Sequence, residues 1–207
     1  MLRRALIIAL LVCVAAPLAA QAPPGWKVRI DKSTSAEDPD DRPDIKVMAM
    51  GKGFHVTSGP AGTFWNAANT GAGDYTAKAT FHLMKPSGHV NYYGLIFGGS
   101  ELEGTNQNYA YFVVAQNGMY QVRHRAGEMV TNVQGRTAHE AIKQPGTDGQ
   151  SANTLEVRVA GNTISYVVNG TVVHSMPKGN LKTDGLVGVR INHLLDVHVD
   201  GFEVVKK

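Results

Sequence analysis

The segment Asn108–Glu128, NYAYFVVAQNGMYQVRHRAGE, is the stretch that best predicts the fold class. Aromatic and β-branched residues dominate Tyr109–Ala115, and this composition is typical of a β-strand. The dipeptide Asn117-Gly118 predicts a two-residue hairpin turn, because both central residues of such a turn adopt φ > 0. Apolar and polar side chains then alternate over residues 119–125, as they do in a strand with one buried face. The segment therefore predicts an antiparallel hairpin.

The same signals recur along the rest of the chain. Asn169-Gly170 predicts another hairpin turn. The spacing of Thr137 and Glu140 fits a capping box, which predicts one short helical segment near 137–142. Further strands are expected at residues 25–30, 45–50, 54–57, 64–66, 74–83, 92–97, 129–133, 155–159, 164–168, 171–175, 185–191 and 195–205. Many short strands separated by turn signals predict an all-β antiparallel β-sandwich.

Residues 1–20 have the pattern of a secretory signal peptide. Two arginines near the N-terminus precede an apolar run over residues 5–18, and small residues predict cleavage near Ala20 or Ala22. The leader is too short and wrongly flanked for a membrane span. We therefore expect an exported protein, periplasmic or extracellular, with a single β-sandwich domain over residues 25–207.

Removal of the leader changes the composition of the mature chain. The only cysteine, Cys13, lies in the leader, so the mature chain has no disulfide and no thiol nucleophile. Lipid attachment at Cys13 is the alternative, although Val12 occupies the position where a lipoprotein signal carries a small residue. The formal net charge falls from +3 to +1 without the two leader arginines, which argues against a nucleic-acid partner.

The order of several strand motifs resembles that of the concanavalin A-like lectin/glucanase superfamily. The motifs are YYGLIFGG (Tyr92–Gly99), NYAYFVV (Asn108–Val114), NTLEVRV (Asn153–Val159), YVVNGTVV (Tyr166–Val173), GLVGVRI (Gly185–Ile191) and DVHVDGFEV (Asp196–Val204). The chain is most similar to bacterial secreted domains of the 3-keto-disaccharide hydrolase type, with laminin-G-like modules as cousins, over residues 64–204. The resemblance implies a jelly roll of two curved antiparallel sheets, with ligands on the concave face or rim loops. A shared fold does not by itself confer activity.

The acidic string Glu-x-Asp-x-x-Glu of the superfamily's glucanases is absent from the sequence. The nearest approach is the last strand, where Asp196, His198 and Asp200 lie on one face. At about 3.3 Å per residue the two aspartates stand roughly 13 Å apart, whereas glycosidase carboxylate pairs need about 5–5.5 Å or about 6.5–9.5 Å. They therefore cannot be catalytic partners. Asp196 and His198 could share a metal ion or a proton, and the alternative is a solvent-facing polar stripe.

Other acidic residues suggest cation binding or acid–base chemistry. Glu101 and Glu103 lie on one predicted loop, where they could act as acid and base, hold calcium, or simply be hydrated. A second candidate for calcium, or for a solvated loop, is the acidic run of Asp38, Asp40, Asp41 and Asp44. None of the eight histidines has helical His-x-x-x-His spacing or a cysteine partner. We expect no cofactor, with calcium as the alternative.

Arginine-bearing strand faces are the strongest pointer to a ligand. Arginine presents a fork of donors that suits hydroxyl pairs and carboxylates, and an aromatic ring can stack on the apolar face of a sugar. The expected hydrogen-bond donors are Arg123, Arg125, Arg190, Asn192 and His193, and the expected stacking ring is Trp65, Tyr93 or Tyr111. The alternative is an ordinary charged face paired with Glu128, Glu156 or Asp196.

These observations predict a secreted β-sandwich that binds a saccharide or another polyhydroxylated ligand and has no catalytic machinery of its own. The first rival is a glycosidase or keto-sugar hydrolase that uses Glu101, Glu103, Asp196 or His198. The second rival is an adhesion or interaction module, which would present a broad exposed apolar patch.

Overall fold

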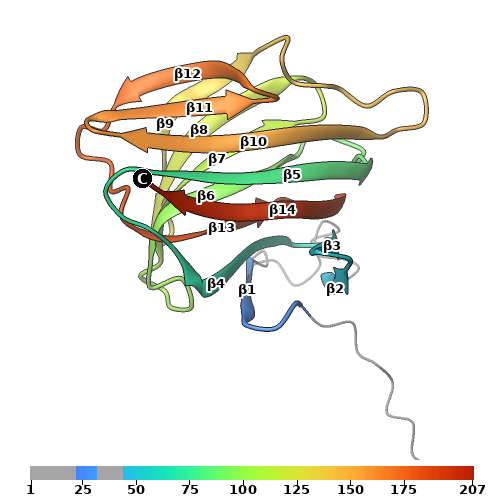
Figure 1. Ribbon diagram of the computed structural model, residues 1–207. Helices are drawn as coiled ribbons and strands as arrows, with labels where there is room; N and C mark the ends of the chain where they lie inside the picture. Colours follow the sequence, from blue (N-terminus) through green and yellow to red (C-terminus); the bar gives the residue numbers. More distant parts are fainter. Residues whose placement is uncertain (1–21, 32–43) are drawn as a thin grey trace, which may run out of the picture.

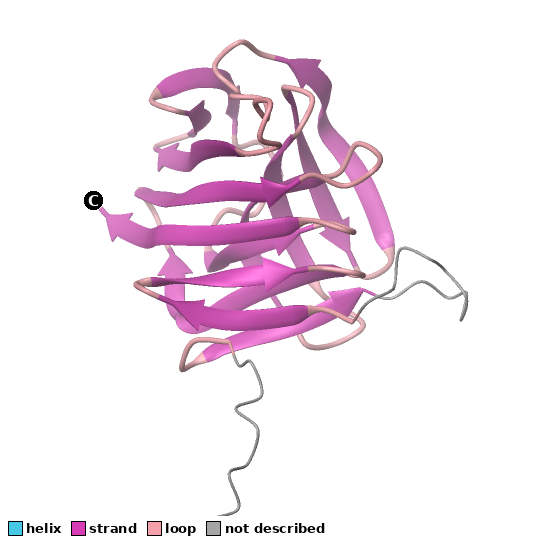
Figure 2. Ribbon diagram, turned by 90° about the vertical axis from the view of Figure 1, so that its right-hand side faces the viewer, coloured by secondary structure: helices cyan, strands magenta, loops and turns pink. Residues whose placement is uncertain are grey.

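A computed structural model describes residues 22–31 and 44–207 of the 207-residue chain. The described residues form fourteen strands and no helix (Figure 2). The strands are arranged in two layers (Figure 1), and every pairing between neighbouring strands is antiparallel. The predicted all-β antiparallel sandwich is confirmed. The predicted signal peptide lies outside the described residues.

Each layer is a seven-stranded sheet. The first sheet has the order β1 (Trp26–Asp31), β4 (Ala61–Gly71), β13 (Gly185–Ile191), β6 (Tyr92–Ser100), β7 (Asn108–Ala115), β8 (Met119–Ala126) and β9 (Met129–Ala138). The second sheet has the order β12 (Thr171–Pro177), β11 (Thr163–Val168), β10 (Ser151–Ala160), β5 (Tyr75–Lys85), β14 (Asp196–Lys206), β3 (Gly53–Thr57) and β2 (Lys46–Met50). The late strands β13 and β14 lie inside the sheets, so each sheet is completed only when the end of the chain is in place.

The core between the sheets is built from the inward face of each strand. Along β5, every second residue from Tyr75 to Leu83 is fully buried and the residues between them are partly exposed, which confirms the predicted alternation. The rings of Phe112 on β7 and Tyr166 on β11 meet across the layers with their centroids 5.1 Å apart. Burial of this apolar surface is the main source of stability.

The two predicted hairpin turns differ in type. Asn169 and Gly170 have φ of 51° and 85°, as a two-residue turn requires, so that prediction is confirmed. The turn between β7 and β8 contains three residues, 116–118, so the two-residue prediction there is wrong. Gly118 takes a φ of 78° and its N–H donates to the carbonyl of Ala115 at 3.1 Å. A three-residue turn needs a left-handed conformation at its last position, which glycine provides.

The short helix predicted near 137–142 is wrong. The edge strand β9 continues through Thr137 to Ala138 and pairs with β8 there, so its backbone groups are already used in the sheet. The hydroxyl of Thr137 donates to a backbone carbonyl two residues earlier instead of capping a helix. Past β9 the chain makes one turn, in which the N–H of Ala141 donates to Nδ1 of His139 at 3.1 Å.

The contact between β13 and β4 leaves no room for a side chain at Gly188. A Cβ there would stand 2.2 Å from the carbonyl oxygen of Phe64 and 3.0 Å from Cβ of Trp65. Gly188→Ala is therefore expected to lower the free energy of unfolding by about 1–3 kcal/mol, because the backbone must shift. Urea unfolding measures the effect.

Gly135→Ala on β9 is the matched control, since no heavy atom of the described residues lies within 4 Å of a Cβ built there. This variant is expected to change the stability by about 0.5 kcal/mol at most, or to increase it slightly. Equal stability of the two variants would contradict the close packing of β13 on β4.

Candidate functional site

The outer face of the first sheet, which is turned away from the second sheet, carries a second buried cluster. On β7, Tyr111 and Val113 flank Phe112 of the core and therefore point to the opposite side. The cluster comprises Trp65, Tyr92, Ile96, Leu102, Tyr109, Tyr111, Val113 and Ala115, none more than 6% exposed. A sheet face that is exposed to water is normally polar, so a buried aromatic cluster on this face indicates that solvent is largely excluded from it.

The first sheet is strongly rolled towards this face. Strands β1 and β8 are five places apart in the sheet, which corresponds to about 24 Å across a flat sheet. Yet Nη1 of Arg125 on β8 lies 3.0 Å from Oδ2 of Asp31 on β1. Two side chains cannot cross such a distance on a flat sheet, so the sheet curves and this surface is the inside of the curve. We call the outer face of the first sheet the hollow face.

A buried ion network crosses the hollow face. Nη1 of Arg190 donates to Oδ2 of Asp31 at 2.8 Å. It also donates to the hydroxyls of Thr63 and Tyr109 at 3.1 and 3.0 Å, and its guanidinium carbon lies 5.5 Å from the ring centroid of Tyr111. Burial opposes the charge of Arg190, but the two tyrosines and Asp31 outweigh it and raise the pKa of Arg190. The guanidinium therefore stays charged inside the protein.

Asp31 is shared by three arginines. Besides Arg190, its Oδ2 accepts from Arg125, and its Oδ1 accepts from Nε of Arg29 at 3.2 Å. Burial alone would raise the pKa of Asp31, but the neighbouring guanidinium groups outweigh burial and hold the pKa below its usual value. Arg125 and Arg190, both predicted as ligand donors, thus have an internal carboxylate partner.

One transverse row of the hollow face joins Trp65 and Tyr111, two of the three predicted stacking rings. Strand by strand, the row runs through Lys27, Trp65, Gly188, Ile96, Tyr111 and Arg123. Nε of Arg123 is buried and has no hydrogen-bond partner among the described residues. The row therefore places two largely buried aromatic rings between a lysine at one end and a guanidinium at the other, whose Nε has no hydrogen-bond partner among the described residues.

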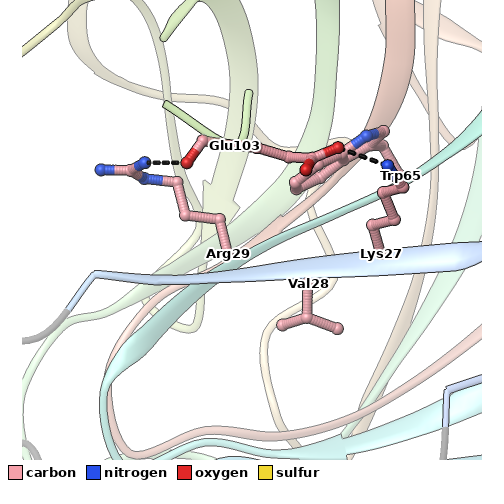
Figure 3. A pocket seen from close by; sticks show the side chains of 5 residues that line it. All are labelled: Lys27, Val28, Arg29, Trp65 and Glu103. Atoms are coloured by element: carbon pink, nitrogen blue, oxygen red, sulfur yellow. Dashed lines mark hydrogen bonds and ion pairs between the residues drawn. The ribbon is translucent and has the colours of Figure 1, made fainter. Parts of the chain in front are cut away.

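A pocket of about 390 Å³ opens at the β1 end of this row (Figure 3). Its lining includes the indole of Trp65, and the side chains of Lys27 and Glu103 form an ion pair beside that ring. Nη1 of Arg29 donates to the backbone carbonyls of Glu103 and Gly104 at 3.2 and 2.7 Å. These contacts hold the β6–β7 connection against β1, so the pocket combines an aromatic ring with fixed charges of both signs.

Three predicted ligand residues lie elsewhere. Asn192 and His193 follow β13, where the N–H of Asn192 donates to the carbonyl of Tyr92 at 2.9 Å. The side-chain atoms Asn192 Oδ1 and His193 Nδ1 are buried, with no hydrogen-bond partner among the described residues. Tyr93 is fully buried in the core, with its ring centroid 5.6 Å from that of Phe81. Tyr93 therefore cannot stack on a ligand at the surface.

Asp196 and His198 lie on the outer face of the second sheet. His198 is opposite His55 and His82 in the neighbouring strands, with ring centroids 6.3 and 5.7 Å away, and Asp196 Oδ1 is 2.7 Å from Nε2 of His55. Burial and the two neighbouring imidazoles lower the pKa of His198 against the opposing effect of Asp200. Within the described part of the chain, no three His, Cys, Asp or Glu side chains are grouped to hold a metal ion.

Two carboxylates of the glycosidase hypothesis, Glu103 and Asp196, lie on opposite sides of the sandwich. Glu103 projects from the β6–β7 connection over the hollow face, whereas Asp196 points away from the other sheet. Packed sheets stand about 10 Å apart, so these two groups are separated by more than about 10 Å. Inverting pairs need at most about 9.5 Å. Glu103 and Asp196 therefore do not form an acid–base pair.

Part of the calcium hypothesis falls outside the described residues. Asp38, Asp40 and Asp41 of the acidic run are in residues 32–43, and Asp44 is the one member within the described ranges. Across residues 22–31 and 44–207 there is no helix whose length and hydrophobicity would let it span a lipid bilayer.

Several residues of the hollow face were not predicted from the sequence. Lys27, Arg29 and Asp31 alternate with apolar residues in β1 and all point to the hollow face. That alternation is visible in the sequence WKVRID and would have indicated a charged outer face. The contributions of Thr63 and Tyr109 have no comparable local signal, because they depend on Arg190 reaching them from a distant strand.

The fold is shared with carbohydrate-related proteins of known structure. The carbohydrate-binding module CBM66 from Bacillus subtilis matches with a TM-score of 0.64 at 10% identity, over 88% of this chain and 96% of that one. A β-glucanase from Bacillus licheniformis matches with a TM-score of 0.56 at 12% identity, over 91% and 96%. The carbohydrate recognition domain of Emp47p matches with a TM-score of 0.54 at 13% identity, over 89% of both chains.

No protein-family model and no curated protein sequence matches the chain. At 10–13% identity the structural likeness shows the fold alone. The fold is a jelly roll of the concanavalin A-like type, as the sequence resemblance predicted.

The Asp31 network yields a test of what holds the hollow face together. Asp31→Asn leaves Arg190 buried without a carboxylate, so the free energy of unfolding at pH 7 is expected to fall by about 3–5 kcal/mol. Asp148→Asn is the matched control, because Asp148 is exposed and asparagine can still accept from the N–H of Gln150. The control is expected to change stability by about 0.5 kcal/mol at most.

The same variant has a predicted pH dependence. Since the pKa of Asp31 is lowered by folding, its contribution is complete above the unfolded pKa of about 3.9 and is lost as the pH falls through the folded value. Denaturant unfolding at pH 7 and pH 3 should therefore show a smaller acid loss for Asp31→Asn than for the wild type. A variant as stable at pH 7 as Asp148→Asn would rule out this role for Asp31.

Proposed function

We propose that the protein is a saccharide-binding β-sandwich whose hollow face takes the ligand, without catalytic machinery of its own. The observation that carries the proposal is the pocket in which Trp65 lies beside Lys27, Arg29 and Glu103. Sugars combine apolar C–H faces with hydroxyl groups. An aromatic ring can contact the apolar face of a sugar, and charged groups around the ring can hydrogen-bond to its hydroxyls.

The pocket is well ordered by its own contacts, which supports binding. Trp65 lines the pocket but is only 3% exposed, so its indole is fixed by packing and presents only a small part of its surface there. Arg29 is held by Asp31 and by two loop carbonyls, so its guanidinium has little freedom left to lose. Binding groups that are ordered before the ligand arrives lose less conformational entropy on binding.

The shared fold is consistent with binding and leaves catalysis open. CBM66 is a carbohydrate-binding module and the Bacillus licheniformis protein is a β-glucanase, and both have this fold. The present sequence lacks the glucanase string, and its Glu103 and Asp196 lie on opposite sides of the sandwich. Both observations favour the binding hypothesis. The narrower resemblance to 3-keto-disaccharide hydrolase-type domains stays a prediction.

The adhesion hypothesis requires a broad exposed apolar surface. The most exposed large apolar side chains of the described residues are spread over different strands, with Met129 on β9, Val205 on β14, Val172 on β12 and Met48 and Met50 on β2. The aromatic side chains of the hollow face are instead buried and surrounded by charges. A polar ligand suits this distribution better than an apolar protein partner.

The site of action is inferred from the leader alone. We propose that residues 1–20 direct export and that the mature protein works in the periplasm or outside the cell. Mass spectrometry of the exported protein would locate the new N-terminus, expected near Ala20 or Ala22. Recovery of the chain in the cytoplasm with its leader intact would contradict export.

Binding is tested with a glycan array followed by calorimetry on the saccharide that binds most tightly. Lys27→Ala and Glu103→Gln are each expected to weaken that interaction about tenfold or more, because each removes a charged hydrogen-bonding group. Both side chains are largely exposed, so the variants should fold normally. Lys46→Ala, at an exposed position on β2 of the second sheet, is the control and should bind as the wild type does.

Two results would contradict the proposal. One is an array on which no saccharide binds. The other is a saccharide that binds Lys27→Ala and Glu103→Gln as tightly as it binds the wild type. Release of a shorter saccharide during the incubation would show that the protein is an enzyme.

A further inference from the structure

Among the described residues, the hollow face carries more positive than negative charge. Contacts place two carboxylates on it, those of Asp31 and Glu103. The cations that contacts or strand register place there are six, Lys27, Arg29, Arg123, Arg125, Arg136 and Arg190. The excess is local, because the whole sequence has 20 Lys and Arg against 17 Asp and Glu.

Two of these arginines differ from the rest, because no carboxylate of the described residues pairs with them. Arg29, Arg125 and Arg190 share Asp31, and Lys27 pairs with Glu103. Among the residues that the structure describes, Arg123 and Arg136 make no ion pair with an acidic side chain. By contrast, Arg158 on the second sheet lies 2.7 Å from Glu156.

Of the two arginines, Arg123 gives the more direct indication of a ligand site. Its Nε is buried without a hydrogen-bond partner within the described part of the chain, whereas the guanidinium also interacts with the hydroxyl of Tyr111, its neighbour in the transverse row. A buried N–H of a charged group that makes no hydrogen bond is costly, so an acceptor supplied by a ligand would be bound favourably. A carboxylate is the acceptor whose two oxygens match the guanidinium fork.

Arg136 is a second cation on the same face that pairs with no carboxylate of the described residues. Its guanidinium carbon lies 5.8 Å from the ring centroid of Tyr92, a member of the buried cluster. The side chain is exposed, so its charge is available to a ligand in solution. Three strands lie between those of Trp65 and Arg123 in the sheet, so an oligosaccharide rather than a single sugar would contact both residues.

We propose that the ligand of the hollow face is an acidic oligosaccharide whose sugar units carry carboxylates, as hexuronic acids do. This inference rests on the proposed saccharide-binding function. Trp65 and its pocket receive one end of the chain, and Arg123 and Arg136 receive carboxylates along it. The charge excess also attracts a polyanion from a distance and selects against neutral glycans of the same shape.

The test compares acidic oligosaccharides with neutral derivatives of the same oligosaccharides in which the carboxylates are reduced to alcohols. Fragments of polygalacturonate, alginate and glucuronan are each paired with their carboxyl-reduced derivative, and neutral β-glucan and xylan fragments complete the panel. Calorimetry at low and at physiological salt is expected to show at least one acidic fragment binding tenfold or more tighter than its reduced derivative. Its affinity should fall as salt increases.

Two variants test the arginines. Arg123→Gln and Arg136→Gln are each expected to reduce the preference for the acidic fragment over its reduced derivative, by about threefold or more. Arg136 is exposed, so that variant tests the inference even if Arg123→Gln were poorly folded. Arg158→Gln on the second sheet is the control and should keep the full preference.

The outcomes separate this inference from the function on which it rests. If reduced and acidic fragments bind equally well, saccharide binding stands and the acidic ligand is overturned. If sulfated glycans bind and none of the uronate fragments does, the carboxylate assignment is overturned. If neither neutral nor acidic fragments bind, the proposed function fails and the inference fails with it.

Discussion

The hollow face depends on the ion pairs that the carboxylate of Asp31 makes with three arginines. A buried guanidinium such as that of Arg190 is tolerated only when a counter-charge and hydrogen bonds compensate for its lost hydration. Asp31 provides the charge, and the hydroxyls of Thr63 and Tyr109 provide the remaining acceptors. The same carboxylate also binds Arg125, five strands away in the sheet, so it connects the two sides of the rolled sheet.

The roll of the sheet explains how one surface can be both apolar and charged. Curvature brings Trp65, Ile96 and Tyr111 of one row close enough to shelter one another, although they face away from the core. The charged side chains of β1 and β8 then reach over this cluster from the two sides. The second sheet has no such arrangement on its outer face, where polar residues such as His55 and His198 face outwards.

The strands could be predicted from the sequence more fully than their arrangement. Alternation identified the segments because one buried face is a local property, as β5 shows. The helix near 137–142 was mistaken because a capping box is also local, and pairing of β9 with β8 outweighed it. Strand order was not predictable, since β13 inserts between β4 and β6 through pairings that span up to 129 residues.

The arginines show the same limit at the level of the site. From the sequence, Arg123 and Arg125 were both predicted to donate hydrogen bonds to a ligand from the same face of one strand. In the structure, the two side chains differ in their contacts. Arg125 meets Asp31, which is 94 residues away, and its charge is thereby compensated within the protein. Arg123, two residues earlier, has no such partner among the described residues. Equal charge and equal orientation therefore do not imply equal roles: an arginine compensated by the protein stabilises the fold, and one left uncompensated is available to a ligand.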